Sequence, residues 1–568
     1  MELPIIGNSF ANMRRDNCTY VDKTRYLYKM VKQGGCYFLS RPRRFGKTLL
    51  LDTLGTLLEG NRELFKGLWI DSSGYDFRKH QVIKLSMPEE CSNVTNFENF
   101  LIRDVKEAAM AKGADLNAEK MPREVSPAYV LRELVRVLYY RERIPVAILI
   151  DEYDAPIQRV LGKTKRAAKI RMVLQDFYSH VKKMYENDVV RVVFVTGITK
   201  FAYSTITGFN NYIDLTLDPE YNAVCGFTPD EFMKHFEEYL PDVLDNRKSK
   251  KRMPPDADLE DLKKEIIDYY DGYSWDGKNR VLNPFSTVMT LREKTLGPHW
   301  YDTANPSLLF EILERDKGVM DFPVNAKMTA SYLNKANIEN PKLNPLLFYS
   351  GYLTVEKIIG KDYFFKLPNK EIVEALNNDL LDYLFDSEKH PLDKLGGRIR
   401  NALEKCDATS LAQCFSDILS WRSPEGLRAS EGRLSDIIFV ALKCFQFKTY
   451  RELTESEGRM DLFVALDTRK AFIFEIKHEN YPCDVNKLTA KQKNEWEAKT
   501  AEKLLVEAKE QIDIGKHDVK YRSAYPEVKD VAMAIAGHTR VAIGFFDPKE
   551  NLYEKTDFPK DSPPNTDS

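Results

Sequence analysis

The sequence lacks the features of disulfide-rich secreted proteins and of membrane proteins. Its eight cysteines are scattered and none forms a C-x-x-C pair, which argues against a zinc site and a disulfide framework. The first ten residues, MELPIIGNSF, contain no basic segment followed by an apolar core, so we expect no signal peptide. No apolar run reaches the roughly 18 residues of a membrane span. We therefore expect a cytoplasmic protein without a membrane partner.

The chain also lacks an excess of charge. Its net charge is -2, from 84 Lys and Arg against 86 Asp and Glu residues. Any nucleic-acid surface must therefore be local, because the whole molecule has no positive field. The hydrophobic content of 43% is ordinary for a globular protein, and 568 residues suffice for about three to four domains.

The pattern of apolar runs predicts an α/β protein with several domains. Residues 1–240 alternate short β-branched runs with longer helical segments, which indicates a parallel sheet with crossover helices. The expected strands are 36–40, 82–87, 146–150, 190–196 and 213–217.

Residues 241–400 are expected to be mainly helical. A helix, two strands joined near Gly360 and another helix suit a winged-helix-like unit. The connector 246–258 contains the basic run RKSKKR, which either contacts phosphate or is a solvated linker.

Residues 401–556 change pattern again. They predict a helix, three consecutive strands, a second helix and two more strands, and this order suits a restriction-endonuclease-like α/β domain. The polar, proline-rich tail 557–568 is expected to be disordered.

A phosphate-binding loop is predicted at residues 36–48, CYFLSRPRRFGKT. The strand–loop–helix order places the Lys47 ammonium and the Thr48 hydroxyl at a helix N-terminus, where backbone N–H groups favour phosphate. Arg41 stands where the consensus has its first glycine, so the loop departs from the standard form. We expect its arginines to contact phosphate directly. The predicted nucleotide-binding loop comprises Arg41, Pro42, Arg43, Arg44, Phe45, Gly46, Lys47 and Thr48.

An acidic pair strengthens the nucleotide hypothesis. Asp151 and Glu152 end the apolar run VAILI, at the position of a Walker-B pair. Asp151 would hold Mg²⁺ through water, and Glu152 would orient or deprotonate the attacking water. The long interval after Lys47 leaves room for the strand 82–87 to lie between the two motifs. The simpler alternative is an ordinary α/β domain with a helix-capping threonine and a surface acidic cluster.

The run VTGITK offers a sensor of the γ-phosphate. Either Thr196 or Thr199 would place a hydroxyl beyond the end of the strand 190–196. We therefore predict ATP and Mg²⁺ as cofactors, with Thr196 among the nucleotide-binding residues.

A second catalytic constellation lies at residues 458–477, GRMDLFVALDTRKAFIFEIK. Thirteen residues separate Asp461 from Glu475, and Lys477 follows two positions later. Side chains alternate along a strand, so Glu475 and Lys477 share a face, and a hairpin brings Asp461 beside them. Two carboxylates suit Mg²⁺, and the lysine would orient water or offset developing charge. The alternative is an edge hairpin with a cross-strand ion pair.

Two accessory residues are candidates for the same site. Glu431 either supplies another acidic ligand or stabilises the start of the following helix. Gln511 either reaches the site from the next helix or faces solvent.

Several motifs together resemble the AAA-ATPase-like proteins that carry a C-terminal PD-(D/E)XK nuclease-superfamily domain. They are YVDKTRYLYKM (20–30), FLSRPRRFGKT (38–48), LIDEYDAP (149–156), LDPEYNAVCGFT (217–228), DGYSW (271–275), NPFS (283–286) and LLFYSGYLTV (346–355). The resemblance implies phosphate and Mg²⁺ binding by Lys47 and Thr48, with Asp151 and Glu152 as the Walker-B pair. It also implies a nuclease core of Asp461, Glu475 and Lys477, with Glu431 and Gln511 as accessory residues.

Two functions follow as hypotheses. The first is an ATPase coupled to a metal-dependent nuclease that cleaves DNA or RNA, in defence or mobile-element biology, and that forms a homo-oligomer if its ATP sites are completed in trans. The second is a nucleotide-dependent switch or scaffold whose nuclease-like domain only binds a partner.

Overall fold

The computed structural model divides into two compact units along the chain. The first comprises residues 1–312 and 323–373, and the second comprises 313–322 and 374–568. The structure describes residues 2–5, 7–88, 93–116, 125–160, 164–200, 212–301, 326–334, 342–385, 392–421, 434–455, 458–482, 488–514, 524–547 and 552–555. The expected boundary near residue 240 falls inside the first unit, and the domain limits at 240, 400 and 556 stay predictions. In the described part, no helix is long and apolar enough to cross a membrane.

A five-stranded parallel sheet organises the first unit. Its strands are β1 (Gly35–Ser40), β2 (Val82–Ser86), β3 (Val146–Asp151), β4 (Val190–Gly197) and β5 (Ile213–Asp214). All five predicted strands are present, and every pairing is parallel, as the sequence indicates. The carboxyl ends of the strands therefore meet at one edge, where open parallel sheets bind ligands.

The strand order corrects one expectation. The order is β2-β3-β4-β1-β5, so β4 lies between β1 and β3, and β2 is an edge strand. The strand 82–87 therefore does not lie between the two nucleotide motifs in space. β5 is also shorter than the predicted 213–217, because the chain turns at Thr216, whose N–H bonds to the Asp214 carboxylate at 2.9 Å.

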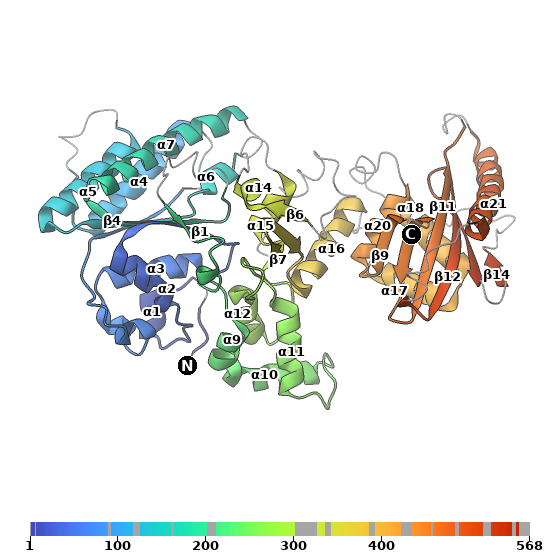
Figure 1. Ribbon diagram of the computed structural model, residues 1–568, viewed down its shortest axis with the longest axis horizontal. Coiled ribbons are helices and arrows are strands. Elements are labelled where there is room, and N and C mark those ends of the chain that lie inside the picture. Colours follow the sequence, from blue (N-terminus) through green and yellow to red (C-terminus); the bar gives the residue numbers. More distant parts are fainter. Residues whose placement is uncertain are drawn as a thin grey trace. The chain divides into compact units, whose positions relative to one another are not determined.

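Helices cover both faces of this sheet (Figure 1). One layer contains α4 (Val94–Ala111), α5 (Pro127–Glu142) and α7 (Thr164–Glu186), whose apolar faces share a buried core with β2, β3 and β4. The other contains α1 (Phe10–Arg15), α2 (Thr24–Gln33) and α3 (Lys47–Leu58). The short helix α6 (Ala155–Gln158) follows β3 directly.

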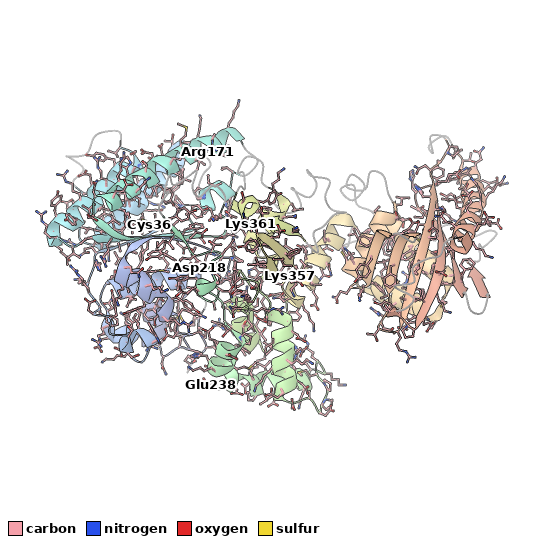
Figure 2. The ribbon with its side chains drawn as sticks, in the orientation of Figure 1. Cys36, Arg171, Asp218, Glu238, Lys357 and Lys361 are labelled. Atoms are coloured by element: carbon pink, nitrogen blue, oxygen red, sulfur yellow. The ribbon has the colours of Figure 1, made fainter. Side chains whose placement is uncertain are left out.

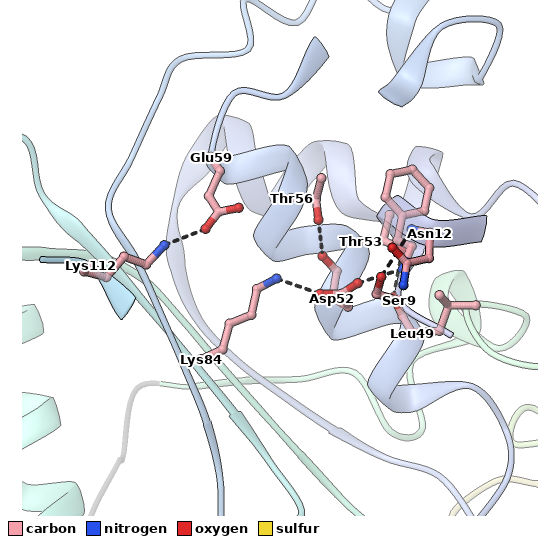
Figure 3. A network of polar contacts seen from close by, with 10 residues as sticks. Ser9, Asn12, Leu49, Asp52, Thr53, Thr56, Glu59, Lys84 and Lys112 are labelled. Atoms are coloured by element: carbon pink, nitrogen blue, oxygen red, sulfur yellow. Dashed lines mark hydrogen bonds and ion pairs between the residues drawn. The ribbon is translucent and has the colours of Figure 1, made fainter. Parts of the chain in front are cut away.

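Polar contacts fix α3 on the sheet (Figure 3). The Asp52 carboxylate accepts hydrogen bonds from the Lys84 ammonium of β2 at 2.6 Å and from the Phe10 N–H at 2.8 Å. At the end of α3, Glu59 pairs with Lys112 at 2.6 Å. These contacts join α3 to β2, to α1 and to the end of α4.

The rest of the first unit is largely helical, as expected. Its helices are α9 (Pro229–Phe236), α10 (Leu240–Ser249), α11 (Leu259–Tyr270), α12 (Pro284–Glu293), α14 (Ala330–Asn334), α15 (Leu343–Ser350) and the start of α16 (Lys370–Leu384). A small antiparallel sheet has the strand order β6 (Lys327–Thr329), β8 (Asp362–Lys366) and β7 (Thr354–Ile359). Along the chain β6 precedes α14, whereas β7 and β8 lie between α15 and α16. The β7–β8 hairpin turns at Gly360, which lies between Lys357 and Lys361 (Figure 2). The predicted helix–strand–strand–helix order is confirmed, and the winged-helix assignment stays a prediction.

The second unit contains a six-stranded mixed sheet. Its helices are α17 (Leu392–Lys405), α18 (Ala408–Ser420), α20 (Leu434–Cys444) and α21 (Ala490–Ile514). Its strands are β9 (Lys448–Glu455), β10 (Gly458–Ala465), β11 (Lys470–Glu479), β12 (Glu527–Ala536), β13 (Arg540–Asp547) and β14 (Leu552–Lys555). β9, β10 and β11 form an antiparallel meander, and β12 runs parallel to β11 after the α21 crossover. The predicted succession of elements is therefore present.

Candidate nucleotide site and a second acidic site

The predicted phosphate loop lies between β1 and α3. Gly46 adopts φ +87° immediately before Lys47, the first residue of α3. A left-handed backbone costs an L-residue about 1–2 kcal/mol, which explains the glycine. The N-terminal N–H groups of α3 therefore lie at the end of the loop, as an anion site requires.

Two loop side chains already contact the elements expected around a nucleotide. The Thr48 hydroxyl donates to the Asp151 carboxylate across 2.6 Å, which joins α3 to the end of β3. The Lys47 ammonium donates to the Pro42 carbonyl at 2.9 Å. Burial lowers the pKa of Lys47, and the nearby carboxylates Asp151, Asp154 and Glu152 oppose that shift. An incoming phosphate would supply the negative charge that the buried ammonium requires.

The acidic pair after β3 is set by its backbone. Asp151 is buried, and its second carboxylate oxygen accepts the Glu152 N–H at 2.9 Å. Glu152 has φ +49°, a conformation that non-glycine residues rarely adopt. Glu152 is half-buried and follows Asp151 at the carboxyl edge of the sheet, and its expected role as general base stays a prediction.

The structure gives Arg41 a different environment from the one we expected. Its guanidinium is fully buried and donates to the carbonyls of Ser40, Thr216 and Tyr221, each at 2.9 Å. It also stacks on the Trp275 ring at 3.9 Å, and burial lowers its pKa to about 10. In this position Arg41 joins the loop to β5 and to the chain beyond it, which leaves its proposed phosphate contact without geometric support.

The other loop residues divide into an exposed and a buried set. Arg43 and Arg44 are exposed and stay available for phosphate, with Arg44 at 5.1 Å from the Phe285 ring. Pro42 and Phe45 are buried, so they shape the loop.

Aromatic residues from later in the first unit hold the loop from outside. Phe45 packs edge-to-face on Tyr273 and Trp275, with ring centroids 4.7 and 5.6 Å away. The Trp300 indole N–H donates to the Arg43 carbonyl at 2.9 Å. These contacts fix the loop by packing as well as by its own backbone. Sequence reasoning did not identify Trp275 or Trp300 as part of this site.

The two sensor candidates differ in whether their hydroxyl is already bonded. Thr196 is fully buried, and its hydroxyl has no hydrogen-bond partner within the described residues. Thr199 donates its hydroxyl to Asp154. Asp154 is a residue that sequence reasoning missed, although its carboxylate stands only three positions after Asp151.

The second acidic site lies on the central strands of the C-terminal sheet. Leu462 of β10 is opposite Phe474 of β11, so the hairpin brings Asp461 next to the stretch that carries Glu475. The Asp461 carboxylate accepts the Ile476 N–H at 2.9 Å. Glu475 is 3% exposed, an unusual position for a carboxylate. The hairpin therefore places Asp461 beside the stretch that carries Glu475, and the convergence of the two carboxylates on one metal ion stays a prediction.

Lys477 links this acidic pair to the crossover helix. Its ammonium donates to Glu475 at 3.1 Å and to the Gln511 side chain of α21. Gln511 therefore reaches the site, as one of its two predicted roles requires. Glu431 lies outside the described residues. Among the residues that the structure describes, no group of three or more His, Cys, Asp or Glu side chains is arranged to hold a metal ion.

Comparison with known proteins bears on the first site. A model of the predicted AAA-ATPase family matches residues 4–207. This AAA-ATPase match covers the phosphate loop, the acidic pair and β4, and ends before the second unit. A protein of Azotobacter chroococcum mcd 1, described as an uncharacterized protein in the vnfD 5' region, is 29% identical over 496 residues, which are 84% of this chain and 89% of that protein.

Two solved structures show distant likeness. A Signal Transduction ATPase with Numerous Domains from Pyrococcus horikoshii, which carries a tetratricopeptide repeat sensor, is 13% identical with a TM-score of 0.21; the match covers 75% of this chain and 58% of that one. A DNA replication initiation factor is 11% identical, with a TM-score of 0.21 and coverage of 75% and 92%. These similarities are too low to carry a functional argument.

Proposed function

We propose that the chain binds and hydrolyses ATP, and that this cycle controls metal-dependent cleavage of DNA or RNA at the second acidic site. The contact between Thr48 and Asp151 carries the ATPase part, since it joins a loop hydroxyl to the carboxylate that ends β3. The match of residues 4–207 to the predicted AAA-ATPase family supports the same activity.

The chemistry of the donor atoms suits Mg²⁺ at the first site. Thr48 and Asp151 offer oxygen donors, which hard divalent cations prefer. When bound, the ion would neutralise charge on the phosphates. Lys47 would contact the β- and γ-phosphates with its ammonium, while Glu152 would accept a proton from the attacking water.

The nuclease part rests on four residues of the second unit. Asp461 and Glu475 would hold Mg²⁺ through their carboxylate oxygens, and the ion would lower the pKa of a bound water. Lys477 would orient that water, and Gln511 would hold Lys477 in place. The contact between Glu475 and Lys477 at 3.1 Å supports this proposal, because it holds a buried carboxylate and an ammonium side by side at the site.

Cleavage of labelled single- and double-stranded DNA and RNA tests the proposal. Each substrate is incubated with Mg²⁺ or Mn²⁺, with and without ATP, and ATP hydrolysis is measured in the same samples. The variants are Lys47→Ala for the first site and Glu475→Ala for the second. Arg469→Ala is the matched control, because Arg469 is exposed in the β10–β11 turn.

Each outcome decides a different part. Hydrolysis that Lys47→Ala abolishes would establish the ATPase. Cleavage that Glu475→Ala abolishes and Arg469→Ala retains would establish the nuclease and its substrate. ATP hydrolysis without cleavage of any substrate would instead favour a nucleotide-dependent switch whose second unit binds a partner.

A further inference from the structure

Asp154 stands at the start of α6 but does not cap its own helix. It occupies the N-cap position without a side-chain capping bond. Its carboxylate is turned instead to the segment after β4, where one oxygen accepts the Ile198 N–H at 3.2 Å and the other accepts the Thr199 N–H at 2.6 Å and the Thr199 hydroxyl. Side chains at this position usually cap the helix that follows, so the reorientation calls for another role.

Gly197 leaves the space that this contact needs. A Cβ built on Gly197 would lie 2.3 Å from the Asp154 carboxylate and 2.6 Å from the Tyr153 ring. Asp154 is only 1% exposed, so it has little room to move away. The end of β4 therefore accommodates the carboxylate as a close-packed partner.

Tyr153 makes a second link between the same two segments. Its hydroxyl donates to the Thr199 carbonyl at 2.8 Å, and its N–H donates to the Thr196 carbonyl at 3.1 Å. The segment after β4 is thus tied by two consecutive side chains to the segment that begins with Asp151 and Glu152.

The contacts continue from there to the phosphate loop. Lys200 pairs with Asp214 at the end of β5. Ser40, which precedes the loop, donates its hydroxyl to the Ile198 carbonyl and its N–H to the Thr216 hydroxyl at 3.1 Å. Side-chain contacts therefore join the carboxyl ends of β1, β3, β4 and β5 next to the predicted nucleotide site.

We propose that Asp154 is a positioning residue for ATP hydrolysis, which sets the segment Ile198–Lys200 in register with Asp151 and Glu152. This inference rests on the proposed ATPase function. When a γ-phosphate binds, a movement of Asp151 and Glu152 would be transmitted by the Asp154 carboxylate to the segment after β4. Strand β4 lies between β1 and β3 in the sheet. ADP lacks that phosphate, so its binding would depend on Asp154 only through the charge near Lys47.

Three variants of the full chain separate this role from a merely structural one. Asp154→Asn keeps the size of the side chain but replaces an acceptor oxygen with a donor. Thr199→Val removes only the hydroxyl contact. Gln158→Met is the matched control, because Gln158 donates to the same carboxylate at 2.8 Å from within α6 and does not belong to the segment after β4.

The measurements are kcat and KM for ATP hydrolysis, the affinities for ATP and ADP, and the unfolding temperature. We expect Asp154→Asn to lower kcat roughly a hundredfold, the typical effect of a small misplacement in a catalytic site. Its ADP affinity should change far less than kcat, because ADP has no γ-phosphate. Thr199→Val should lower kcat less, and Gln158→Met should match the wild type.

Other results would overturn the inference. An Asp154→Asn variant with the kcat of the wild type would do so. An Asp154→Asn variant whose ADP affinity falls together with its unfolding temperature would also do so. If Gln158→Met lowers kcat as much as Asp154→Asn does, the Asp154 carboxylate acts through α6 and not through the segment after β4. If Asp154→Asn does not fold, an unchanged kcat in Thr199→Val decides against the proposal. A wild-type chain without ATP hydrolysis would overturn the proposed function itself.

Discussion

Replacing Arg41 by methionine tests whether this residue holds the phosphate loop or contacts the nucleotide. Methionine keeps much of the apolar stem but removes the guanidinium. The carbonyls of Ser40, Thr216 and Tyr221 would then each lose a 2.9 Å hydrogen bond, and the Trp275 ring would lose its cation.

The magnitude follows from these contacts. A buried carbonyl left without a partner costs about 1–3 kcal/mol, and a desolvated cation–π contact contributes about 2 kcal/mol. Relief from burying a charged group offsets several kcal/mol of that loss. We expect a net loss of about 3 kcal/mol in the free energy of unfolding, a large fraction of the total for an ordinary domain.

Urea unfolding followed by tryptophan fluorescence measures the effect, because Trp275 lies directly against the guanidinium. Arg43→Met and Arg44→Met are the matched controls. Both side chains are exposed, so each should change stability by no more than about 0.5 kcal/mol. If Arg41→Met is as stable as the wild type but binds ATP more weakly, Arg41 contacts phosphate and the structural assignment is wrong.

Four further predictions concern the two sites and the packing around the first. Lys47→Ala should abolish ATP binding, and an unchanged nucleotide affinity would refute the phosphate-loop assignment. Burial lowers the pKa of Lys47, and a bound phosphate would raise it, so ATP affinity should fall as pH rises above the pKa of Lys47 in the nucleotide-free protein. Measuring the Kd for ATP against pH checks this, and a flat profile would contradict it. Gly272→Ala should destabilise the fold by about 3 kcal/mol or more, because φ is +126° and the new Cβ would lie 2.1 Å from a backbone carbonyl. Gly67→Ala, at φ +77° with open space around it, should cost only about 1–2 kcal/mol in the same urea assay, and equal losses would show that backbone strain alone decides. Asp461→Ala and Lys477→Ala should each lower nuclease activity roughly a hundredfold or more while ATP binding persists; loss of both activities would point to misfolding.

Much of the fold could be predicted from local patterns. The five strands of the first sheet and the strand–strand–strand–helix order of the second unit follow from apolar runs and their spacing. The placement of Asp461 beside the stretch that carries Glu475 was also predictable, because a hairpin with alternating side chains leaves few ways to pair them. The family resemblance supplied the expected roles of the site residues. Its AAA-ATPase part agrees with the match of residues 4–207 to the predicted AAA-ATPase family.

Other parts of the site depended on contacts between residues far apart in sequence. A sequence shows that Arg41 replaces a glycine, but it does not show that Trp275 and three carbonyls will surround the guanidinium. In the same way, β4 rather than β2 lies between β1 and β3, because strand order is set by how crossover helices pack on the sheet.

By itself, the sequence determined the chemical inventory at each strand end: a lysine and a hydroxyl after β1, two carboxylates after β3, and an acidic and basic set on β10 and β11. Only the tertiary structure decided which of these groups meet. The Thr48 hydroxyl bonds to Asp151, whereas Asp154 leaves the backbone of its own helix uncapped and bonds to Thr199. The physical reason is that a buried polar group must find a partner, and the partner it finds is the one that packing brings within hydrogen-bond distance.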